Sequence, residues 1–327
     1  MAGPAYSGSS LLGNALGAHP AMAYVGEVLS QLPADVAADD WGCWLCLSEG
    51  RRCPRWTPSV VAALRAGGPS AVPGRLASLT GADVVIDGSK EVRWIWSTAA
   101  PSIDYPPSID YRVLLVLRSP FAFVDSACRE ERFAAFAAAN VWRDTVADAL
   151  RTVNTLSLPV MAVRYEQLAF DPATTLRAVC RFVGVDFDPV MLHFWDHRGH
   201  ATGGNPGAFA WYEGFAPWFS AQLAAIAAGE GADAPRAMRH WLHAYVSADG
   251  VDAAALAAAR YDATVASYSQ RTFGGWVDDK WRRRLSEDDV ATVMGTPGLV
   301  DLATLGGYDL ARLLTRPSGQ IPEDVEQ

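Results

Sequence analysis

The chain has 327 residues, of which 50% are hydrophobic, and a formal net charge of -9 at pH 7. This length suits one large α/β domain or two smaller ones with a sizeable core, and the acidic balance argues against a nucleic-acid partner. No Lys or Arg precedes Arg51, no apolar run is long enough to span a membrane, and the five cysteines do not resemble a secreted disulfide scaffold. We therefore expect a cytoplasmic protein without a membrane partner.

A glycine-containing turn opens the chain and runs into an apolar helix. Residues Gly3 to Ser10 fit the phosphate-loop pattern G-x-x-x-x-G-K-[ST] except that Ser9 replaces the Lys. The inward-pointing N–H groups of such a turn and the positive end of the helix can hold an anion. Without the Lys that meets the β- and γ-phosphates, the loop suits a single 5′-phosphate group better than ATP. An ordinary helix N-cap at Ser7 or Ser9 is the alternative interpretation.

Short apolar runs then alternate with helical patterns along the chain. Strands are expected at Ala23–Val25, Asp83–Asp87, Arg112–Leu117 and Pro159–Val163. Helices are expected at 28–40, within 58–79, and at 121–154, 172–184, 217–228, 235–247 and 252–268. This alternation predicts an α/β fold with a parallel sheet, and polar residues follow the strand ends, where open α/β sheets bind ligands. Only Met1 to Ala5 precede the loop, so the first strand is either very short or incomplete.

Several motifs occur in the order found in one enzyme family. They are Ala5 to Leu12, His19-Pro20, Gly26-Glu27, Asp87 to Lys90, Arg118 to Ser126, Val163 to Leu168 with Asp171-Pro172, Gly204-Asn205-Pro206, and Asp279 to Tyr308. This series resembles the sulfotransferases that use 3′-phosphoadenosine 5′-phosphosulfate (PAPS), in particular bacterial members similar to tyrosylprotein sulfotransferases. The resemblance implies a P-loop-like, three-layer α/β/α domain with a central parallel sheet. It also implies transfer of a sulfuryl group from PAPS to a hydroxyl, with 3′,5′-ADP as product and no metal required.

The resemblance also implies roles for individual residues. Glu27 matches the general base, and Lys90 matches the cation that offsets charge beside the donor. Arg118 and Ser126 match the 3′-phosphate site, where a guanidinium makes bidentate hydrogen bonds. The expected donor-binding residues are Ser7, Gly8, Ser9, Ser10, Leu11, Arg118, Ser126, Tyr165 and Arg271. Each also has a plainer interpretation, such as a dipole-stabilised Glu27 or a Tyr165 at the edge of the core.

Two positions depart from the family pattern. Tyr6 stands where the family has a loop Arg, and Ala208 stands where an Arg usually follows Gly-Asn-Pro. Arg271 precedes Trp276 at about the spacing expected after that motif. We therefore expect residues 206–270 to be a mostly helical insertion, a lid or acceptor cap, in a domain formed by residues 1–205 and 271–327.

The acidic chain and the aromatic-rich insertion favour a small-molecule hydroxyl acceptor, such as a natural product of secondary metabolism. A catalytically impaired sulfotransferase-like binding domain is the first alternative, because removing one electrostatic donor typically lowers the rate by about 10²–10³. A P-loop kinase is a second alternative, which the missing loop Lys disfavours. Assembly into a homo-oligomer is left open.

Two groups of residues have metal-ligating side chains. Cys43-x2-Cys46-x6-Cys53 could bind zinc, but a structural site needs four ligands and the spacing supplies three. His193, His197 and His200 have a spacing that metals can use, although their aromatic neighbours favour ordinary packing. The preferred interpretation is a packed cysteine-rich loop and no metal site.

Overall fold

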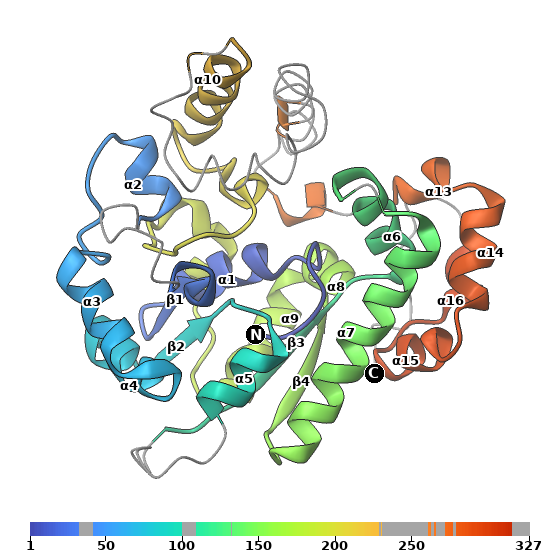
Figure 1. Ribbon diagram of the computed structural model, residues 1–327, viewed down its shortest axis with the longest axis horizontal. Helices are drawn as coiled ribbons and strands as arrows, with labels where there is room; N and C mark the ends of the chain where they lie inside the picture. Colours follow the sequence, from blue (N-terminus) through green and yellow to red (C-terminus); the bar gives the residue numbers. More distant parts are fainter. Residues whose placement is uncertain are drawn as a thin grey trace.

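The structure is a computed structural model that describes residues 1–32, 42–99, 109–131, 133–228, 230, 261–262, 265, 272–276 and 279–315. Within this part of the chain, strands and helices alternate as expected (Figure 1). The strands are β1 (Met22–Gly26), β2 (Val84–Asp87), β3 (Val113–Leu117) and β4 (Val160–Arg164). All four contain or overlap the runs that the sequence indicated.

Helices make up most of the remaining described structure. The α-helices of the first half are α1 (Ser9–Gly17), α2 (Trp44–Ser48), α3 (Pro58–Ala66), α4 (Gly68–Thr80), α5 (Val92–Ala99), α6 (Pro120–Glu130) and α7 (Ala135–Thr155). Those that follow are α8 (Tyr165–Phe170), α9 (Pro172–Val183), α10 (Phe215–Ala227), α13 (Trp281–Arg284), α14 (Glu287–Gly295), α15 (Leu299–Leu305) and α16 (Leu310–Thr315). Short 3-10 helices occur at η1 (Val28–Gln31), η3 (Pro189–Asp196), η4 (Pro206–Phe209) and η6 (Phe273–Trp276). The helix expected at 235–247 and most of the one at 252–268 lie outside the described residues.

The segment before the loop joins two pairs of parallel strands. β1 pairs with β2, and β3 pairs with β4, both in parallel. Ala2 makes parallel bridges to Lys90 beyond β2 and to Leu115 of β3. Its N–H donates to the Leu114 carbonyl and its carbonyl accepts from the Val116 N–H, each at 2.8 Å. The expected first strand is therefore a single bridging residue, and it carries the loop to the middle of the strand array.

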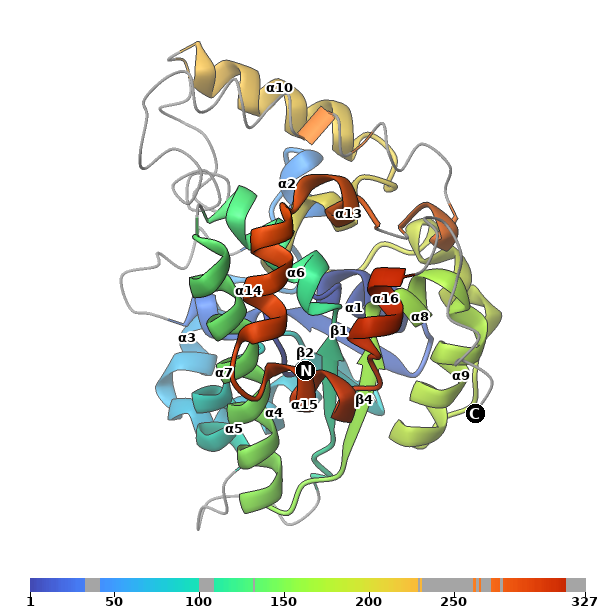
Figure 2. The same ribbon diagram turned by 90° about the vertical axis from the view of Figure 1, so that its right-hand side faces the viewer.

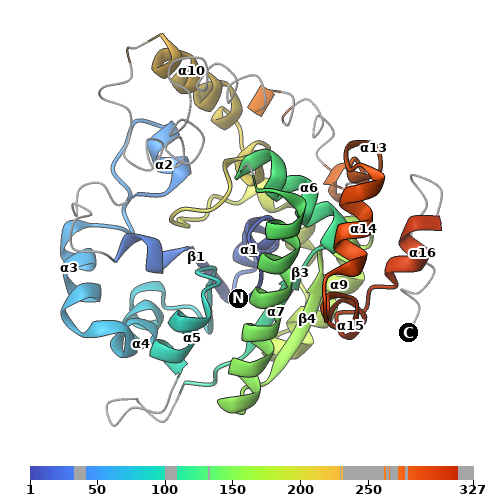
Figure 3. The ribbon, with the colours of Figure 1, turned by 45° about the vertical axis from the view of Figure 1, so that its right-hand side comes forward.

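The two faces of β3 pack against different helices. Leu114 and Val116 belong to a core cluster that includes side chains of α1, α2 and α9. Val113, Leu115 and Leu117 belong to a second cluster with side chains of α6, α7, α14 and α15. This alternation is what a strand buried on both sides requires, since successive side chains point to opposite faces. In Figures 1 and 3 the C-terminal helices α13 to α16 lie across the molecule from α3 and α4, and Figure 2 looks onto the side that carries these C-terminal helices.

One expected helix is two helices in the structure. The stretch 121–154 divides into α6 and α7, with extended backbone at Ala134 as the N-cap of α7. An unbroken helix of this length would run about 50 Å at about 1.5 Å per residue. By turning back, α7 instead packs against α6 and places the Trp142 indole N–H 3.0 Å from the Arg118 carbonyl. The prediction of one unbroken helix was wrong because the sequence between α6 and α7 contains no Gly or Pro to indicate a break. The break follows instead from the packing of α7 against α6.

The described residues include no helix both long and apolar enough to cross a membrane.

We expect Gly3→Ala to destabilise the fold because its Cβ would lie 2.2 Å from the Val116 carbonyl oxygen, at a φ of +133°. That φ belongs to a region that is essentially glycine-only. Gly50→Ala is the matched control, since Gly50 also has positive φ (+63°) but no atom within 4 Å of its added Cβ. The free energy of unfolding, from urea titration, should fall about 1–3 kcal/mol further for Gly3→Ala than for the control. Equal losses would contradict the close packing of this segment on β3.

Candidate functional site

The loop between Ala2 and α1 turns sharply at three positions. Gly3, Tyr6 and Gly8 have φ values of +133°, +57° and +84°. A Cβ on Gly8 would lie 2.3 Å from Cδ2 of Tyr165, so the loop backbone lies directly on that ring. Helix α1 follows at Ser9 with no side-chain cap and no acidic residue in its first turn. The N-terminus of α1 therefore keeps the amide donors and positive dipole end that favour an anion.

Arg118 reaches this loop from the end of β3. Its Nη1 donates to the Tyr6 carbonyl at 2.9 Å and to Ser126 Oγ at 3.2 Å. Its Cζ lies 5.0 Å from the centroid of the Tyr165 ring. The structure thus brings Arg118, Ser126, Tyr165 and the loop together, although 112 residues separate Tyr6 from Arg118.

The carboxylate of Glu166 holds the turn that follows Arg118. Glu166 Oε1 accepts from the Ser119 N–H at 2.9 Å, and Oε2 accepts from the Tyr308 hydroxyl at 2.7 Å. The direction in which Arg118 leaves β3 is therefore fixed from the start of α8, just after β4, and from the C-terminal segment.

The Tyr6 side chain does not take the place of a loop Arg. Its hydroxyl donates to Glu131 at the end of α6, and its ring packs against the α6–α7 core cluster. The guanidinium of Arg118 contacts the Tyr6 backbone carbonyl.

Glu27 and Lys90 form an ion pair beside the loop. Glu27 directly follows β1 and Lys90 lies three residues beyond β2, so the parallel pairing brings them to the same edge. Their side chains are 25% and 20% exposed. Lys90 adopts φ +58°, which is uncommon for a non-glycine residue.

Asp87 determines the path of the chain up to Lys90. Its Oδ1 accepts from the Ser89 N–H at 2.8 Å and the Ser89 hydroxyl at 2.5 Å, and its Oδ2 accepts from Trp94 Nε1 at 2.6 Å. Ser89 Oγ in turn accepts from the Leu29 N–H at 3.0 Å. Asp87 therefore links the segment after β2 to the segment after β1.

Thr202 extends the edge of β1 and was not identified from the sequence. Its N–H donates to the Val25 carbonyl at 3.0 Å, and its carbonyl accepts from the Glu27 N–H at 2.7 Å. Three residues later the Asn205 N–H donates to Ser10 Oγ at 3.1 Å. The segment around Thr202 thus holds both Glu27 and the start of α1. Its nearness to the Gly204-Asn205-Pro206 motif is the sequence signal that could have drawn attention to it.

Tyr24 lies under the same loop and hydrogen bonds with Ser10. Burial, together with the carboxylates of Glu27 and Asp87, raises the pKa of Tyr24 far above its ordinary value. The phenol therefore remains protonated and neutral beneath the loop.

The cysteine-rich segment acquires a fourth partner in the structure. Cys43, Cys46 and Cys53 gather around His200, with all four candidate ligand atoms within 4.8 Å of one another. Neither His193 nor His197 belongs to this group; His193 instead makes an edge contact with Trp195. The preference for a packed loop assumed only three ligands, and the structure corrects that count.

Of the remaining predicted donor-binding residues, four lie in or next to the start of α1 and one lies outside the described residues. Ser7 Oγ contacts the Ala5 carbonyl at 3.5 Å, and Ser9, Ser10 and Leu11 form the buried first turn of α1. Arg271 lies outside the described residues, so its expected role stays a prediction. The roles of the other site residues also remain predictions, although their side chains share one region.

The solved structures similar to this chain include two sulfotransferase domains. One belongs to the olefin synthase of Synechococcus PCC 7002, with 17% sequence identity and a TM-score of 0.47 over 94% of this chain and 93% of that chain. The other belongs to the curacin biosynthetic pathway, with 16% identity and a TM-score of 0.43 over 63% and 80%. No family model and no curated protein matches the chain. At these identities and TM-scores, the two structures do not assign an activity to this chain.

We expect Asp87→Asn to destabilise the protein, because an amide cannot accept from both Trp94 and Ser89. One donor would face the new NH2 group, and a buried donor without a partner typically costs about 1–3 kcal/mol. Urea titration should therefore show a loss in this range. Asp83→Asn, an exposed carboxylate just before the same strand, is the control and should change the free energy of unfolding little. Equal effects would contradict the role of Asp87 as the link.

Proposed function

We propose that this chain is a sulfotransferase that moves a sulfuryl group from PAPS to a hydroxyl of a small-molecule acceptor. One observation carries the proposal: Arg118 contacts Ser126, the ring of Tyr165 and the backbone of an anion-binding loop at once. The strand array, with helices on both faces of β3, supports the finer proposal of a P-loop-like, three-layer domain.

The residues around the loop have the donor set that PAPS requires. The amides at the start of α1 and the hydroxyls of Ser9 and Ser10 would hold its 5′ end. Arg118 and Ser126 would hold the 3′-phosphate by charge-assisted hydrogen bonds, and Tyr165 would contact the adenine. When bound, PAPS supplies an activated sulfuryl group and a phosphate leaving group.

Glu27 and Lys90 would act in the transfer step itself, one as proton acceptor and the other as a stabilising positive charge. Glu27 would accept the proton of the attacking hydroxyl, and a positioned carboxylate of this kind contributes about 10²–10⁴ in rate. Lys90, already paired with Glu27, would offset negative charge on the leaving phosphate. The hydrogen bonds that Thr202 and Asp87 make to the segments after β1 and β2 would keep Glu27 and Lys90 in place.

Arg118 would also bring positive charge to the loop, where the family's loop Arg is replaced by Tyr6. Its guanidinium already contacts the Tyr6 carbonyl, so it supplies positive charge at the loop while Tyr6 turns toward Glu131. We further propose that the insertion 206–270 covers the acceptor side. In its described part, Phe215 and Phe219 of α10 pack edge-on against Trp44, whose indole N–H donates to the Gly204 carbonyl at 3.2 Å.

Calorimetry with 3′,5′-ADP tests donor binding directly. We expect saturable binding to the full chain, weakened about 10-fold or more in Arg118→Lys, because Lys cannot reproduce the planar fork of Arg. Arg181→Lys, an exposed residue of α9, is the matched control and should bind like wild type. No binding at millimolar 3′,5′-ADP would reject the proposal, and tighter binding of ATP would favour the kinase alternative.

Turnover is tested by following 3′,5′-ADP release from PAPS with a panel of small phenols and alcohols. Glu27→Gln should lower kcat/KM by about 10²–10⁴ while leaving 3′,5′-ADP binding nearly unchanged, because the base acts on the acceptor. Glu287→Gln, exposed on α14, is the control. If wild type binds 3′,5′-ADP but stays at the level of Glu27→Gln with every acceptor, the chain is a non-catalytic binding domain.

A further inference from the structure

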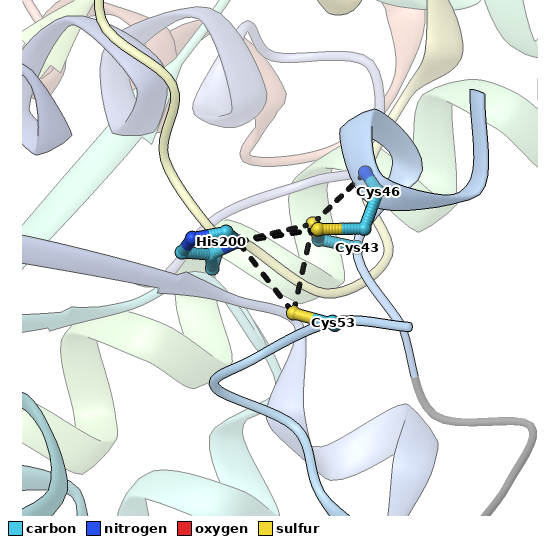
Figure 4. Close-up of side chains that lie close together, drawn as sticks. All are labelled: Cys43, Cys46, Cys53 and His200. Atoms are coloured by element: carbon cyan, nitrogen blue, oxygen red, sulfur yellow. Dashed lines mark hydrogen bonds between the residues drawn. The ribbon is translucent and has the colours of Figure 1, made fainter. Parts of the chain in front are cut away.

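The four residues of the Cys43–His200 cluster come from two distant parts of the chain. Cys43 is the N-cap of α2, Cys46 lies in the first turn of that helix, and Cys53 follows in the next loop. His200 arrives from the segment after η3, 157 residues beyond Cys43. Figure 4 shows the three sulfur atoms and the imidazole directed toward a common centre. The cysteines are buried and His200 is partly buried.

Four of the six separations between the ligand atoms of this cluster match a tetrahedral metal site. His200 Nδ1 lies 3.5, 3.4 and 3.5 Å from the sulfurs of Cys43, Cys46 and Cys53, and the sulfurs of Cys43 and Cys53 are 3.8 Å apart. Bonds of about 2.3 Å to sulfur and about 2.05 Å to nitrogen at tetrahedral angles require S···S separations of about 3.8 Å and S···N separations of about 3.6 Å. These four separations therefore already match the spacing that zinc needs, and the other two sulfur pairs lie within 4.8 Å.

Neither a disulfide nor a set of thiol hydrogen bonds fits the cluster as well as a metal ion does. A disulfide requires sulfurs about 2.05 Å apart, whereas all five cysteines are free in the structure. Thiols are weak donors and acceptors, so mutual hydrogen bonds explain poorly why three of them meet one imidazole. Backbone N–H groups also point at the sulfurs, from Cys46 to Cys43 at 3.4 Å and from Arg55 and Trp56 to Cys53. Such donors stabilise negatively charged thiolates, which is the form that binds metals.

We propose that Cys43, Cys46, Cys53 and His200 bind one zinc ion in a closed, structural site. Three thiolates and one imidazole in a tetrahedron are typical of zinc, and four protein ligands leave no position for a substrate. The site therefore stabilises structure and takes no part in the transfer chemistry.

The ion would hold the neighbourhood of Glu27 together. Thr202, two residues after His200, bridges both Cys43 and Gly26. The Trp56 indole N–H donates to the His200 carbonyl at 2.7 Å. Zinc would thus fasten the segment of residues 43–56 to the segment of residues 200–205, which contacts Glu27 and Ser10.

Elemental analysis of the full chain, purified without chelators, is the first test. We expect one zinc per chain, and X-ray absorption at the zinc edge should show three sulfur ligands at about 2.3 Å and one nitrogen at about 2.0–2.1 Å. Stoichiometric iron would overturn the assignment to zinc. No bound metal after incubation with zinc and a reductant, or a disulfide among the three cysteines by mass spectrometry, would overturn the site itself.

Variants separate the cluster from the other cysteines and histidines. His200→Ala should lower the zinc affinity, measured in competition with a chelator. The loss should exceed the roughly 10–100-fold that follows when a residue hydrogen bonded to a metal ligand is removed. His197→Ala and Cys128→Ser, outside the cluster, should keep wild-type affinity. If His200→Ala fails to fold, cobalt exchanged into wild type should show tetrahedral absorption with a thiolate charge-transfer band, and octahedral spectra would reject the site. These measurements do not depend on sulfuryl transfer, so they can fail or succeed independently of the proposed function.

Discussion

The candidate site depends on the pairing of Ala2 between the segment after β2 and the middle of β3. This residue connects two pairs of parallel strands that do not pair with each other directly in the described part of the chain, and the glycine loop begins immediately after it. The carboxyl ends of parallel strands meet at one edge, so Glu27, Lys90 and Arg118 all arrive beside that loop. A single bridging residue suffices because both of its backbone groups bond to β3.

Near this pairing, each charged side chain contacts either a group of opposite charge or neutral polar and aromatic groups, including a backbone carbonyl. Lys90 pairs with Glu27, while Arg118 lies against carbonyl and hydroxyl oxygens and the face of Tyr165. Burying such groups is tolerable only when each is hydrogen bonded or paired. In the same arrangement Arg118 contacts the loop that leads into the N-terminus of α1, whose positive dipole end favours an anion, and this is the basis of the proposed donor site.

A zinc ion at the Cys43–His200 cluster would hold an irregular segment that contacts Glu27. Residues 200–205 contain no long helix or strand, yet their backbone holds both Glu27 and Ser10. Loops without regular structure usually need tight packing or a covalent or metal link to hold one conformation. A zinc ion two residues before Thr202 would provide that link at the point where the loop meets β1.

The sequence by itself determined the strands, the glycine loop and helix α9, which ends at Gly184 in the left-handed conformation as its pattern predicted. These features are local, since turn residues and apolar periodicity act within about a dozen positions. The break between α6 and α7, the reach of Arg118 to Tyr6 and the joining of His200 to three cysteines were decided by the tertiary structure. No local pattern records these three features: the break follows from the packing of α7 on α6, and the other two join chain segments more than a hundred residues apart.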